Sequence, residues 1–338
     1  MSGSTPIVVS MGDPAGIGPE IILKAWQRLR HHPMVFAAIG DFDVVSDTAD
    51  ALGLPGPIPI DHPGLAADHF AETLPVLGTG IVPPGEVRPG NPSAGNAAAV
   101  KAAIESGVQL CRAGKASALV TAPIAKSVMY EAGFDFPGHT EFLAELTQDV
   151  PMHGPRGPAM MLTGGGLRAV LVTIHEPLQR AIDLLSEDRI MRTARIAHQA
   201  LIEDYGIAHP RLALAGLNPH AGEGGSLGDE EREIVNPAAA RLRQEGIDIS
   251  DARPPDTLFH EEARVGYDAA ICLYHDQGLI PVKTLDFHGG VNVTLGLPIV
   301  RTSPDHGTAF SIAGKGEARP DSMIAAIREA MAIARHRA

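Results

Sequence analysis

Short apolar runs that alternate with helical segments are the feature that most constrains how this chain can fold. The first run, residues 6–11, has the length and composition of a buried strand, and residues 19–29 then carry apolar side chains at helical spacing. A strand, a glycine-rich turn and a helix in this order predict a βα unit and an α/β fold. Further strands are predicted at 34–40, 118–121, 159–163, 169–174, 211–217 and 269–273, and further helices at 44–54, 97–111, 124–132, 142–146, 190–205, 230–244 and 322–334.

Length and composition narrow the class of protein. A chain of 338 residues exceeds the size at which one hydrophobic core keeps growing, so we expect two domains. The formal net charge of −13 argues against a nucleic-acid-binding surface. The sequence has no apolar run of about 18 residues and no basic N-terminal segment followed by an apolar one, so we expect no membrane span and a cytoplasmic location. Cys111 and Cys272 lie in apolar sequence, which predicts neither a disulfide framework nor a thiolate metal site.

The glycine-rich turn at residues 12–20, GDPAGIGPE, joins the first strand to the first helix. It could present backbone N–H groups to an anion at the helix N-terminus. It matches neither the dinucleotide fingerprint G-x-G-x-x-G nor the P-loop, and the alternative is a tight turn with no ligand. Residues 55–91, rich in Pro and Gly, are predicted to be loops with short strands at 58–60 and 74–77, peripheral to the chemistry.

Three predicted strands end in a histidine, namely His175, His220 and His275. In a mostly parallel sheet these strand ends lie along one edge, where ligands of α/β folds bind. Three imidazoles there would suit a divalent metal that keeps positions open for substrate, and the alternative is that each is a structural histidine. Acidic residues close to the strand ends could orient the rings or complete the coordination: Glu176, Glu223, Asp256 and Asp276.

A second set of polar residues indicates an anionic ligand. Lys283, Asn292 and Arg301 follow one another at intervals of nine residues, each beside apolar or glycine-rich sequence. Lys and Arg are rarely buried unless paired, so we expect an anion near them, the alternative being surface cations at strand ends. His139 precedes a predicted helix with Thr140 as its N-cap, a place where a phosphate could bind, or a capped surface turn.

Five motifs follow one another along the chain: GDPAGIGPE (12–20), PGHTEF (137–142), GLNPHAGEGG (216–225), YHDQGLIPVK (274–283) and GVNVTLGLPIVRTSPDHGTAF (290–310). Together they resemble the 4-hydroxythreonine-4-phosphate dehydrogenase family. The resemblance covers nearly the whole chain in order and is weakest at residues 55–91. Close relatives of that family oxidise other phosphorylated hydroxy acids.

The resemblance extends to the isocitrate and isopropylmalate dehydrogenase superfamily. It implies a two-domain α/β/α sandwich that is not a Rossmann fold. Residues 1–137 with 290–338 would form the domain with the cofactor loop, and residues 138–289 the domain with the metal histidines and the dimer interface. It also implies a homodimer with a shared active site, to which the partner supplies one metal histidine.

The implied activity is metal-dependent, NAD- or NADP-linked oxidation of 4-phosphooxy-L-threonine in pyridoxal 5′-phosphate biosynthesis. The product is a 3-oxo acid that decarboxylates to 3-amino-2-oxopropyl phosphate. One divalent metal per subunit (zinc, magnesium, manganese or cobalt) would be bound by His175, His220 and His275. The resemblance assigns substrate binding to His139, Thr140, Lys283, Asn292 and Arg301, cofactor binding to Gly16, Gly18, His306, Gly307, Ala313 and Gly314, and it leaves Asp256, Asp276, Lys283 and water as candidates for the catalytic base.

Other functions stay open at this point. A paralogous enzyme could oxidise threonate or erythronate phosphate by the same chemistry. A non-redox phosphate acyltransferase of similar fold needs no strand-end histidines, and an inactive metal-binding protein has no need of the cofactor loop at residues 306–316. The sequence departs from the family at Ser311, where many relatives carry Asp, and at Asp13, where some carry Glu.

Overall fold

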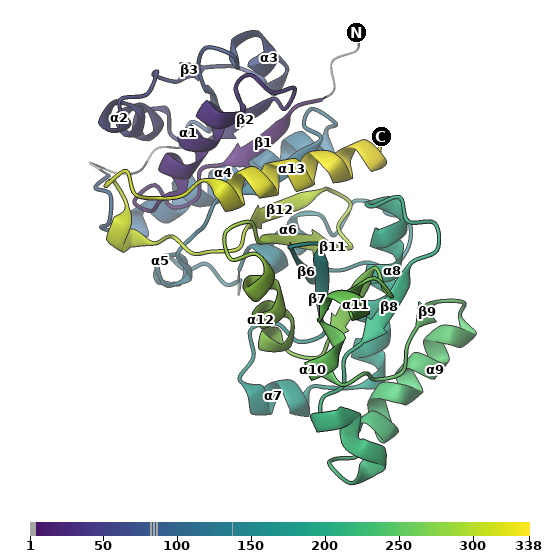
Figure 1. The fold of residues 1–338 in the computed structure, drawn as a ribbon. Helices are drawn as coiled ribbons and strands as arrows, with labels where there is room; N and C mark the ends of the chain where they lie inside the picture. The colour runs from purple at the N-terminus through teal and green to yellow at the C-terminus, as the bar shows by residue number, and fades with distance from the viewer. Residues whose placement is uncertain (1–4, 82, 84, 86, 137) are drawn as a thin grey trace. The chain divides into compact units, whose positions relative to one another are not determined.

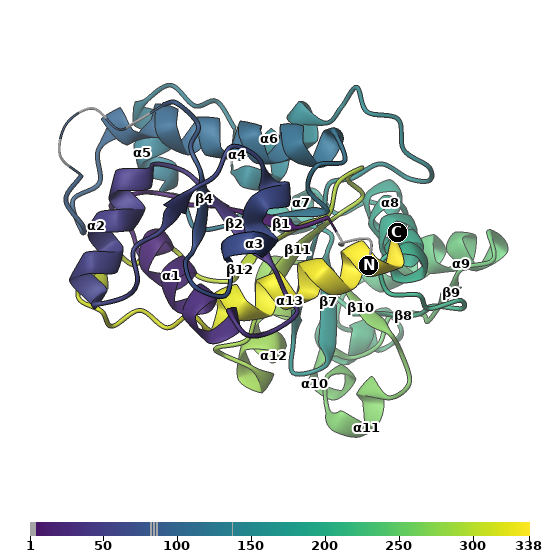
Figure 2. The same cartoon turned by 90° about the horizontal axis from the view of Figure 1, so that it is seen from above.

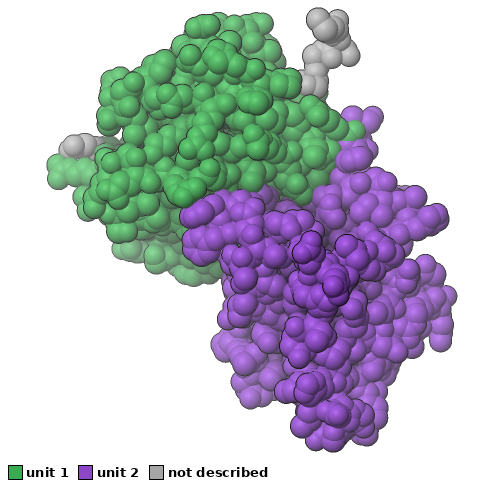
Figure 3. Space-filling view, in the orientation of Figure 1, with its two compact units in different colours: residues 1–150, 298–335 green, residues 151–297, 336–338 purple. Residues whose placement is uncertain are grey.

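The predicted alternation of strands and helices is present in the computed structural model, which describes residues 5–81, 83, 85, 87–136 and 138–338 (Figure 1). The result is a mixed α/β fold built on a large sheet. The chain divides into two compact units, coloured separately in Figure 3. Unit 1 comprises residues 1–150 and 298–335, and unit 2 comprises residues 151–297 and 336–338. The domain boundaries at 137/138 and 289/290 stay a prediction, and Pro137 lies outside the described residues.

Parallel strands form the centre of unit 1. They lie in the order β3-β4-β2-β1-β5-β12, and each described pair of neighbours is parallel. The residues of β1, β2 and β5 are all buried, as expected of strands covered on both faces. The short strands expected in segment 55–91 are confirmed as β3 and β4. The bounds are β1 Ile7–Ser10, β2 Phe36–Ile39, β3 Ile58–Pro59, β4 Pro75–Leu77, β5 Ala118–Thr121 and β12 Arg301–Pro304.

Helices cover both faces of the unit 1 strands. The connection from β1 to β2 and the connection from β4 to β5 run in opposite directions along the sheet. Right-handed crossovers therefore place their helices on opposite faces, and Figure 2 shows α1 and α13 on one side of the strands and α4 on the other. The bounds are α1 Gly18–Leu29, α2 Phe42–Leu52, α3 Ala66–His69, α4 Ala97–Arg112, α5 Lys126–Glu131, α6 His139–Leu146 and α13 Asp321–His336.

Unit 2 joins an antiparallel hairpin to parallel strands, in the order β11-β6-β7-β10-β8-β9. The predicted glycine turn is confirmed: β6 and β7 pair antiparallel around Gly165 and Gly166, whose φ angles of +57° and +79° suit glycine. Strand β10 pairs in parallel with both β7 and β8. The bounds are β6 Ala159–Gly164, β7 Leu167–Leu171, β8 Arg211–Leu214, β9 Asp248–Ile249, β10 Ala269–Cys272 and β11 Val291–Leu295.

Two helical segments of unit 2 differ from the sequence prediction. The helix expected over residues 230–244 begins as a π-helical turn, Glu231–Val235, before α9, Asn236–Gln244. Residues after β10 form helix α12, His275–Leu285, which was not predicted, and Lys283 lies in its last turn. The remaining helices of unit 2 are α7 Leu178–Asp183, α8 Glu187–Glu203, α10 Pro255–Leu258 and α11 Glu261–Arg264.

The structure also bears on membranes and thiols. No helix in the described part of the chain is long and apolar enough to cross a bilayer.

Cys111 is half-buried and Cys272 is buried, and neither forms a disulfide. Burial raises the pKa of the Cys111 thiol to about 12, so this thiol is protonated at neutral pH and is a poor nucleophile.

Candidate active site

The three strand-end histidines lie along one edge of the unit 2 sheet. His175 follows β7, His220 follows β8 and His275 follows β10. Because β10 is paired in parallel with both β7 and β8, the carboxyl ends of these strands point the same way. The sequence-based expectation of a common edge is therefore confirmed. This is the edge at which α/β folds bind ligands.

Two of these histidines come close together. The ring centroids of His175 and His275 are 5.5 Å apart, and the rings are inclined by 44°. Nδ1 of His275 lies 2.7 Å from Oδ1 of Asp276. A carboxylate at this position stabilises the tautomer protonated at Nδ1, in which Nε2 carries a lone pair. The pair is therefore suited to provide two nitrogen ligands to a divalent metal.

No third ligand completes this pair. Among the residues that the structure describes, no three His, Cys, Asp or Glu side chains gather closely enough to hold a metal ion. His220 therefore does not join His175 and His275 in a three-ligand cluster within this chain. The imidazole nitrogens of His175 and His275 are suitable metal ligands. Two ligands from one chain are fewer than the three or four protein ligands usual for a bound divalent metal.

His220 stands on an unusual stretch of backbone. Residues His220–Gly224 all have positive φ angles, between 43° and 79°, and three of the five are not glycine. Left-handed backbone is unfavourable for residues with a side chain, and it persists only where the surroundings enforce it. Such strain is often found at functional loops, which agrees with the predicted role of His220.

The carboxylate of Glu231 fixes the start of this loop. Its Oε1 accepts hydrogen bonds from the backbone N–H groups of Leu217 and Asn218, both at 2.7 Å, and its Oε2 accepts one from the Asn218 amide at 2.9 Å. Glu231 is buried and belongs to the π-helical turn. Sequence reasoning missed it, because an acidic residue in an amphipathic helix is normally taken to face solvent.

Gln277 ties two of the strand ends together. Its Oε1 accepts a hydrogen bond from Leu273 N at 2.7 Å, and its Nε2 donates to the carbonyl of Gly216 at 2.6 Å. The first partner follows β10 and the second follows β8, so one buried amide sets the separation of the two segments that carry His275 and His220. Sequence reasoning assigned it no role.

The two acidic candidates for a catalytic base line one cavity of unit 2. Asp256, in α10, and Asp276, in α12, both line a space of about 370 Å³ that also has Phe259 and Tyr274 in its wall. The same cavity is walled by apolar side chains of α12, such as Ile280. Lys283 lies further along α12, with Nζ 5.4 Å from the centre of the Phe287 ring. The structure thus places all three base candidates on or beside α12.

In unit 1, Arg301 forms the centre of a buried polar group. It is the first residue of β12, only 3% exposed, and its Nη2 donates to Thr121 Oγ1 at 2.6 Å. Burial lowers the pKa of Arg301 to about 10, although the Glu141 carboxylate opposes the shift. The guanidinium is still charged at neutral pH, so its burial favours an anionic ligand.

His139 lies beside this arginine. Burial, followed by the positive charges of Arg301 and Lys126, lowers the pKa of His139 well below its usual value. Its Nε2 is buried and has no hydrogen-bond partner among the described residues. A neutral imidazole with one unmet nitrogen, next to two cations, matches the electrostatic requirement of a bound phosphate. Sequence reasoning missed Lys126, because no sequence pattern distinguishes a ligand-binding lysine from an ordinary one at the start of a short helix.

Thr140 and Asn292, two more of the predicted substrate-binding residues, lie in different units. Thr140 was expected to cap a helix, but α6 begins at His139 with Gly138 in the N-cap position, so Thr140 lies in the first turn. Asn292 lies in β11 of unit 2, where its Oδ1 is buried and lacks a hydrogen-bond partner in the described structure. His139, Thr140 and Arg301 therefore belong to unit 1, and Lys283 and Asn292 belong to unit 2.

The glycine turn after β1 is required sterically. Gly12 has φ of +74°, and a Cβ there would overlap the carbonyl of Pro123, while a Cβ at Gly18 would overlap the carbonyl of Met11. Asp13 Oδ1 accepts the N–H of Ala15 at 3.0 Å, and burial nevertheless raises the pKa of this carboxyl. The structural interpretation of the turn thus accounts for Gly12 and Gly18 without a ligand.

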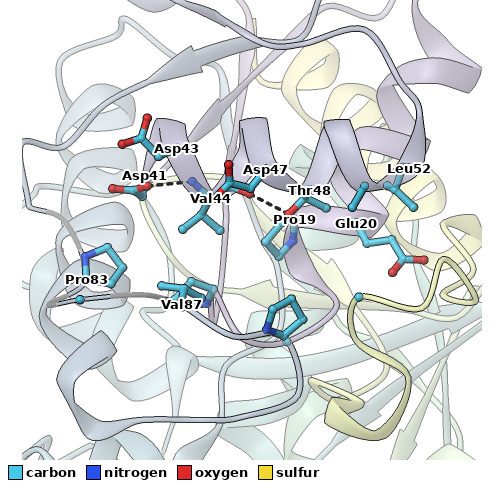
Figure 4. A pocket seen from close by; sticks show the side chains of 16 residues that line it. Pro19, Glu20, Asp41, Asp43, Val44, Asp47, Thr48, Leu52, Pro83 and Val87 are labelled. Carbon is cyan, nitrogen blue, oxygen red and sulfur yellow. Dashed lines mark hydrogen bonds between the residues drawn. The ribbon is translucent and has the colours of Figure 1, made fainter.

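The predicted cofactor residues come from two stretches that contact each other. The N–H of Ile17 donates to the carbonyl of Thr308 at 3.0 Å. Gly16 and Gly314, one from each stretch, line a single cavity of about 470 Å³ (Figure 4). His306 Nδ1 lies 3.1 Å from the Gly307 carbonyl, and Ala313 is buried. The two stretches therefore share one cavity in unit 1, which Gly16 and Gly314 border directly.

Comparison with known proteins shows the family to which the chain belongs. A curated protein from Maricaulis maris (strain MCS10), named 4-hydroxythreonine-4-phosphate dehydrogenase, is 68% identical over 100% of both chains. One of the same name from Caulobacter vibrioides is 54% identical over 99% of both. The crystal structure of 4-hydroxythreonine-4-phosphate dehydrogenase from Klebsiella pneumoniae is 39% identical, with a TM-score of 0.86 over 98% of this chain and 100% of that one. Residues 32–330 match the family described as pyridoxal phosphate biosynthetic protein PdxA, and the chain belongs to that family.

Proposed function

We propose that this chain is a metal-dependent, NAD(P)-linked dehydrogenase of 4-phosphooxy-L-threonine, the compound also called 4-hydroxythreonine 4-phosphate. The names of the full-length relatives support this substrate. The structural observation that carries the proposal is the pair of His175 and His275, whose rings converge beside a carboxylate that sets the tautomer of one of them. The reaction would oxidise a secondary alcohol to a 3-oxo acid, which loses carbon dioxide to leave 3-amino-2-oxopropyl phosphate.

The protein would bind two groups that supply chemistry its side chains lack. A divalent metal stabilises negative charge on the substrate oxygen, and NAD(P) accepts the hydride. His175 and His275 would hold the metal, with His220 as the third ligand. Imidazole ligands suit zinc and cobalt better than magnesium, which prefers oxygen.

The charged ends of the substrate would be bound by the polar residues described above. His139, Thr140 and Arg301, with Lys126 beside them, would neutralise one anionic group, and Lys283 and Asn292 would contact another. The unmet Nε2 of His139 supports a role for that residue as a hydrogen-bond partner of the ligand. A fixed set of donors orients the substrate, which lowers the entropic part of the barrier.

Removal of the hydroxyl proton requires a base close to the histidine pair. Asp276 contacts His275 at 2.7 Å, and in that role it orients a metal ligand. Asp256 lines the same cavity and does not contact His275 in this way, so of the two carboxylates it is the better candidate for the catalytic base. Lys283 and a water molecule are the other groups that could take the proton.

We also propose a homodimer with a shared site, in which His220 of the partner subunit completes the metal ligands. The finding that only two of the three histidines converge within the described chain supports this arrangement. At the level of fold class, we propose an isocitrate and isopropylmalate dehydrogenase-like α/β/α sandwich, with domains at 1–137 plus 290–338 and at 138–289. The lack of a G-x-G-x-x-G fingerprint in the first turn supports that class over a Rossmann fold.

Absorbance at about 340 nm tests the redox reaction directly. Purified protein, NAD or NADP and 4-phosphooxy-L-threonine should give a rise in absorbance that a chelator removes and an added divalent metal restores. A rise only with threonate or erythronate phosphate would assign the chain to a paralogous substrate. No rise with any of these compounds, in protein loaded with each metal in turn, would overturn the proposal.

A further inference from the structure

An exposed aromatic ring lies beside one of the proposed substrate-binding residues. Phe287 follows helix α12 and is 69% exposed. The centre of its ring is 5.4 Å from Nζ of Lys283, which lies in the last turn of the same helix. An aromatic face attracts an ammonium group at distances up to about 6 Å. A single exposed apolar residue needs no explanation by itself, but a ring placed over a substrate-binding cation indicates a function.

The turn that carries Phe287 is closed by its own groups. Asp286 ends helix α12, and its N–H donates to the carbonyl of Val282 at 2.9 Å. Its Oδ1 accepts a hydrogen bond from the N–H of Gly289 at 2.7 Å. A Cβ at Gly289 would overlap the Asp286 carboxylate, so glycine is needed there to keep this bond. The backbone on both sides of Phe287 is therefore held in place.

Packing against the β6–β7 hairpin supports the turn. A Cβ at Gly164, the last residue of β6, would lie 3.5 Å from both Cβ of Asp286 and Cα of Gly290. The hairpin backbone thus lies directly against the turn. The ring of His288 is 5.2 Å from the ring of Phe287, centre to centre, at an angle of 89°. This edge-to-face arrangement is favourable for two aromatic rings, and it restricts the orientation of Phe287.

The same turn joins two proposed substrate-binding residues that differ in how they are held. Asn292 lies in β11, where it pairs with Leu162 of β6, so the sheet fixes its backbone. Lys283 carries its ammonium group at the end of a flexible four-carbon stem. Such a side chain loses rotamer freedom when it binds a ligand, which weakens binding. A contact that restricts the stem beforehand reduces this loss.

We infer that Phe287 is a positioning residue for the substrate, and that its ring holds the Lys283 ammonium group ready to bind an anionic group of a phosphorylated hydroxy acid. The inference rests on the proposed function, in which Lys283 contacts such a group. Lys283 would touch the substrate, and Phe287 would act through Lys283. Loss of the ring should therefore weaken substrate binding and leave the hydride transfer nearly unchanged.

NMR of the methylated protein tests the contact in the absence of substrate. Reductive methylation with isotope-labelled formaldehyde marks lysine amines and keeps their charge. One methyl resonance should be shifted upfield by the Phe287 ring, and Lys283→Arg should remove it. Phe287→Leu should abolish the shift, and Phe287→Tyr should retain it. The signals are few, because the chain has only the lysines Lys24, Lys101, Lys115, Lys126, Lys283 and Lys315.

A double-mutant cycle tests the positioning role. Titration calorimetry with metal-loaded protein measures the affinity for 4-phosphooxy-L-threonine without NAD or NADP, so that no turnover occurs. Phe287→Leu keeps an apolar side chain but removes the aromatic face, and it should weaken binding by about fivefold. Lys283→Met should weaken binding by roughly thirtyfold. The double variant should bind as Lys283→Met does, because the ring acts only through the lysine.

Steady-state kinetics separate positioning from a general structural effect. Phe287→Leu should raise KM for the substrate by about fivefold and change kcat by less than about twofold, and Phe287→Tyr should restore KM. Gly289→Ala displaces the Asp286 carboxylate without changing Phe287 or Lys283, so it should give part of the same rise. Val265→Ala, at another exposed apolar residue of unit 2 (75% exposed), should behave as wild type.

The outcomes separate this inference from the proposed function. The inference would be overturned by an unshifted methyl resonance, by independent effects of the two substitutions on affinity, or by wild-type binding in Phe287→Leu. Dissociation of Phe287→Leu into monomers, seen by sedimentation velocity, would also overturn it, because the ring would then be a subunit contact. A shifted resonance in a protein that binds no phosphorylated hydroxy acid would contradict the proposed function, and the positioning role with it, while confirming the contact.

Discussion

The polar group around Arg301 and the histidine edge of unit 2 are both located at strand ends, but they differ in how complete they are. Arg301 is buried, bonded to Thr121 and next to a neutral His139, so its surroundings are assembled before any ligand arrives. The histidine edge brings two rings together and leaves His220 on a strained loop. One region is preorganised for an anion, and the other requires an additional ligand to become a closed metal site. This difference predicts where substitutions act on ligand affinity and where they act on assembly.

The strongest test of preorganisation is Arg301→Lys. Lysine keeps the charge but loses the planar fork and the geometry of the bond to Thr121, so substrate turnover should fall by roughly a thousandfold in kcat/KM. Steady-state kinetics at saturating cofactor measure this loss. Arg28→Lys, at an exposed ion pair with Asp321, should be nearly silent. Turnover within about threefold of wild type would mean that Arg301 is only structural.

The strained loop can be probed through Glu231→Gln. An amide cannot accept from both the backbone N–H groups and the Asn218 side chain at once, so one buried donor is left unmet. We expect a loss of about 2 to 3 kcal/mol in the free energy of unfolding, measured by urea denaturation. Glu233→Gln changes an exposed residue of the same turn and should cost less than about 0.5 kcal/mol. Similar stability of the two variants would show that Glu231 does not hold the loop.

Asp276→Asn addresses the histidine pair. Asparagine offers an uncharged and weaker acceptor, so the Nδ1-protonated tautomer of His275 is stabilised less, and apparent metal affinity should fall by about tenfold. Competition against a chromophoric chelator measures the affinity, with Asp248→Asn on β9 as a surface control. An unchanged affinity would indicate that Asp276 does not orient the ring.

The smallest expected effect concerns His139 and pH. The pKa of His139 is lowered in the folded state, so the unfolded chain binds a proton here first as the pH falls. The stability associated with neutral His139 is fully present above about pH 6.5 and is lost as the pH falls below it, by at most about 1.4 kcal/mol per pH unit. Urea denaturation of wild type and His139→Gln at two pH values should show a shallower dependence in the variant. His153→Gln, at a side chain that is 92% exposed, should keep the wild-type slope.

The sequence predicts the elements that depend on local pattern. The strand-end histidines were correctly located because apolar runs and the residues that follow them are neighbours in the chain, and the parallel pairing of β10 with β7 and β8 brings their ends to one edge. The helix that carries Lys283 was not predicted, because Pro281 lies inside it. Thr140 was misassigned because Gly138, two residues earlier, takes the cap position.

The remaining features depend on contacts between distant residues. Glu20 and Ala318 are hydrogen-bonded although they are 298 residues apart, and Gln277 donates to Gly216, which is 61 residues away. Lys126 matters because the fold brings it close to His139. Sequence periodicity carries no signal for such partners. The hydrogen bonds of Glu20 to Ala318 and of Glu231 to Leu217 and Asn218 are therefore seen only in the structure.

The order of strands in unit 2 has a consequence for synthesis. Strand β10 lies between β7 and β8, yet it is the last of the three to be made. On the ribosome, β8 therefore has no neighbour on that side until residues 269–272 have emerged, and His175 and His275 stay apart until the same moment. A metal ion cannot guide the early folding of this unit through that pair. It can join only a nascent chain whose central strand is already in place.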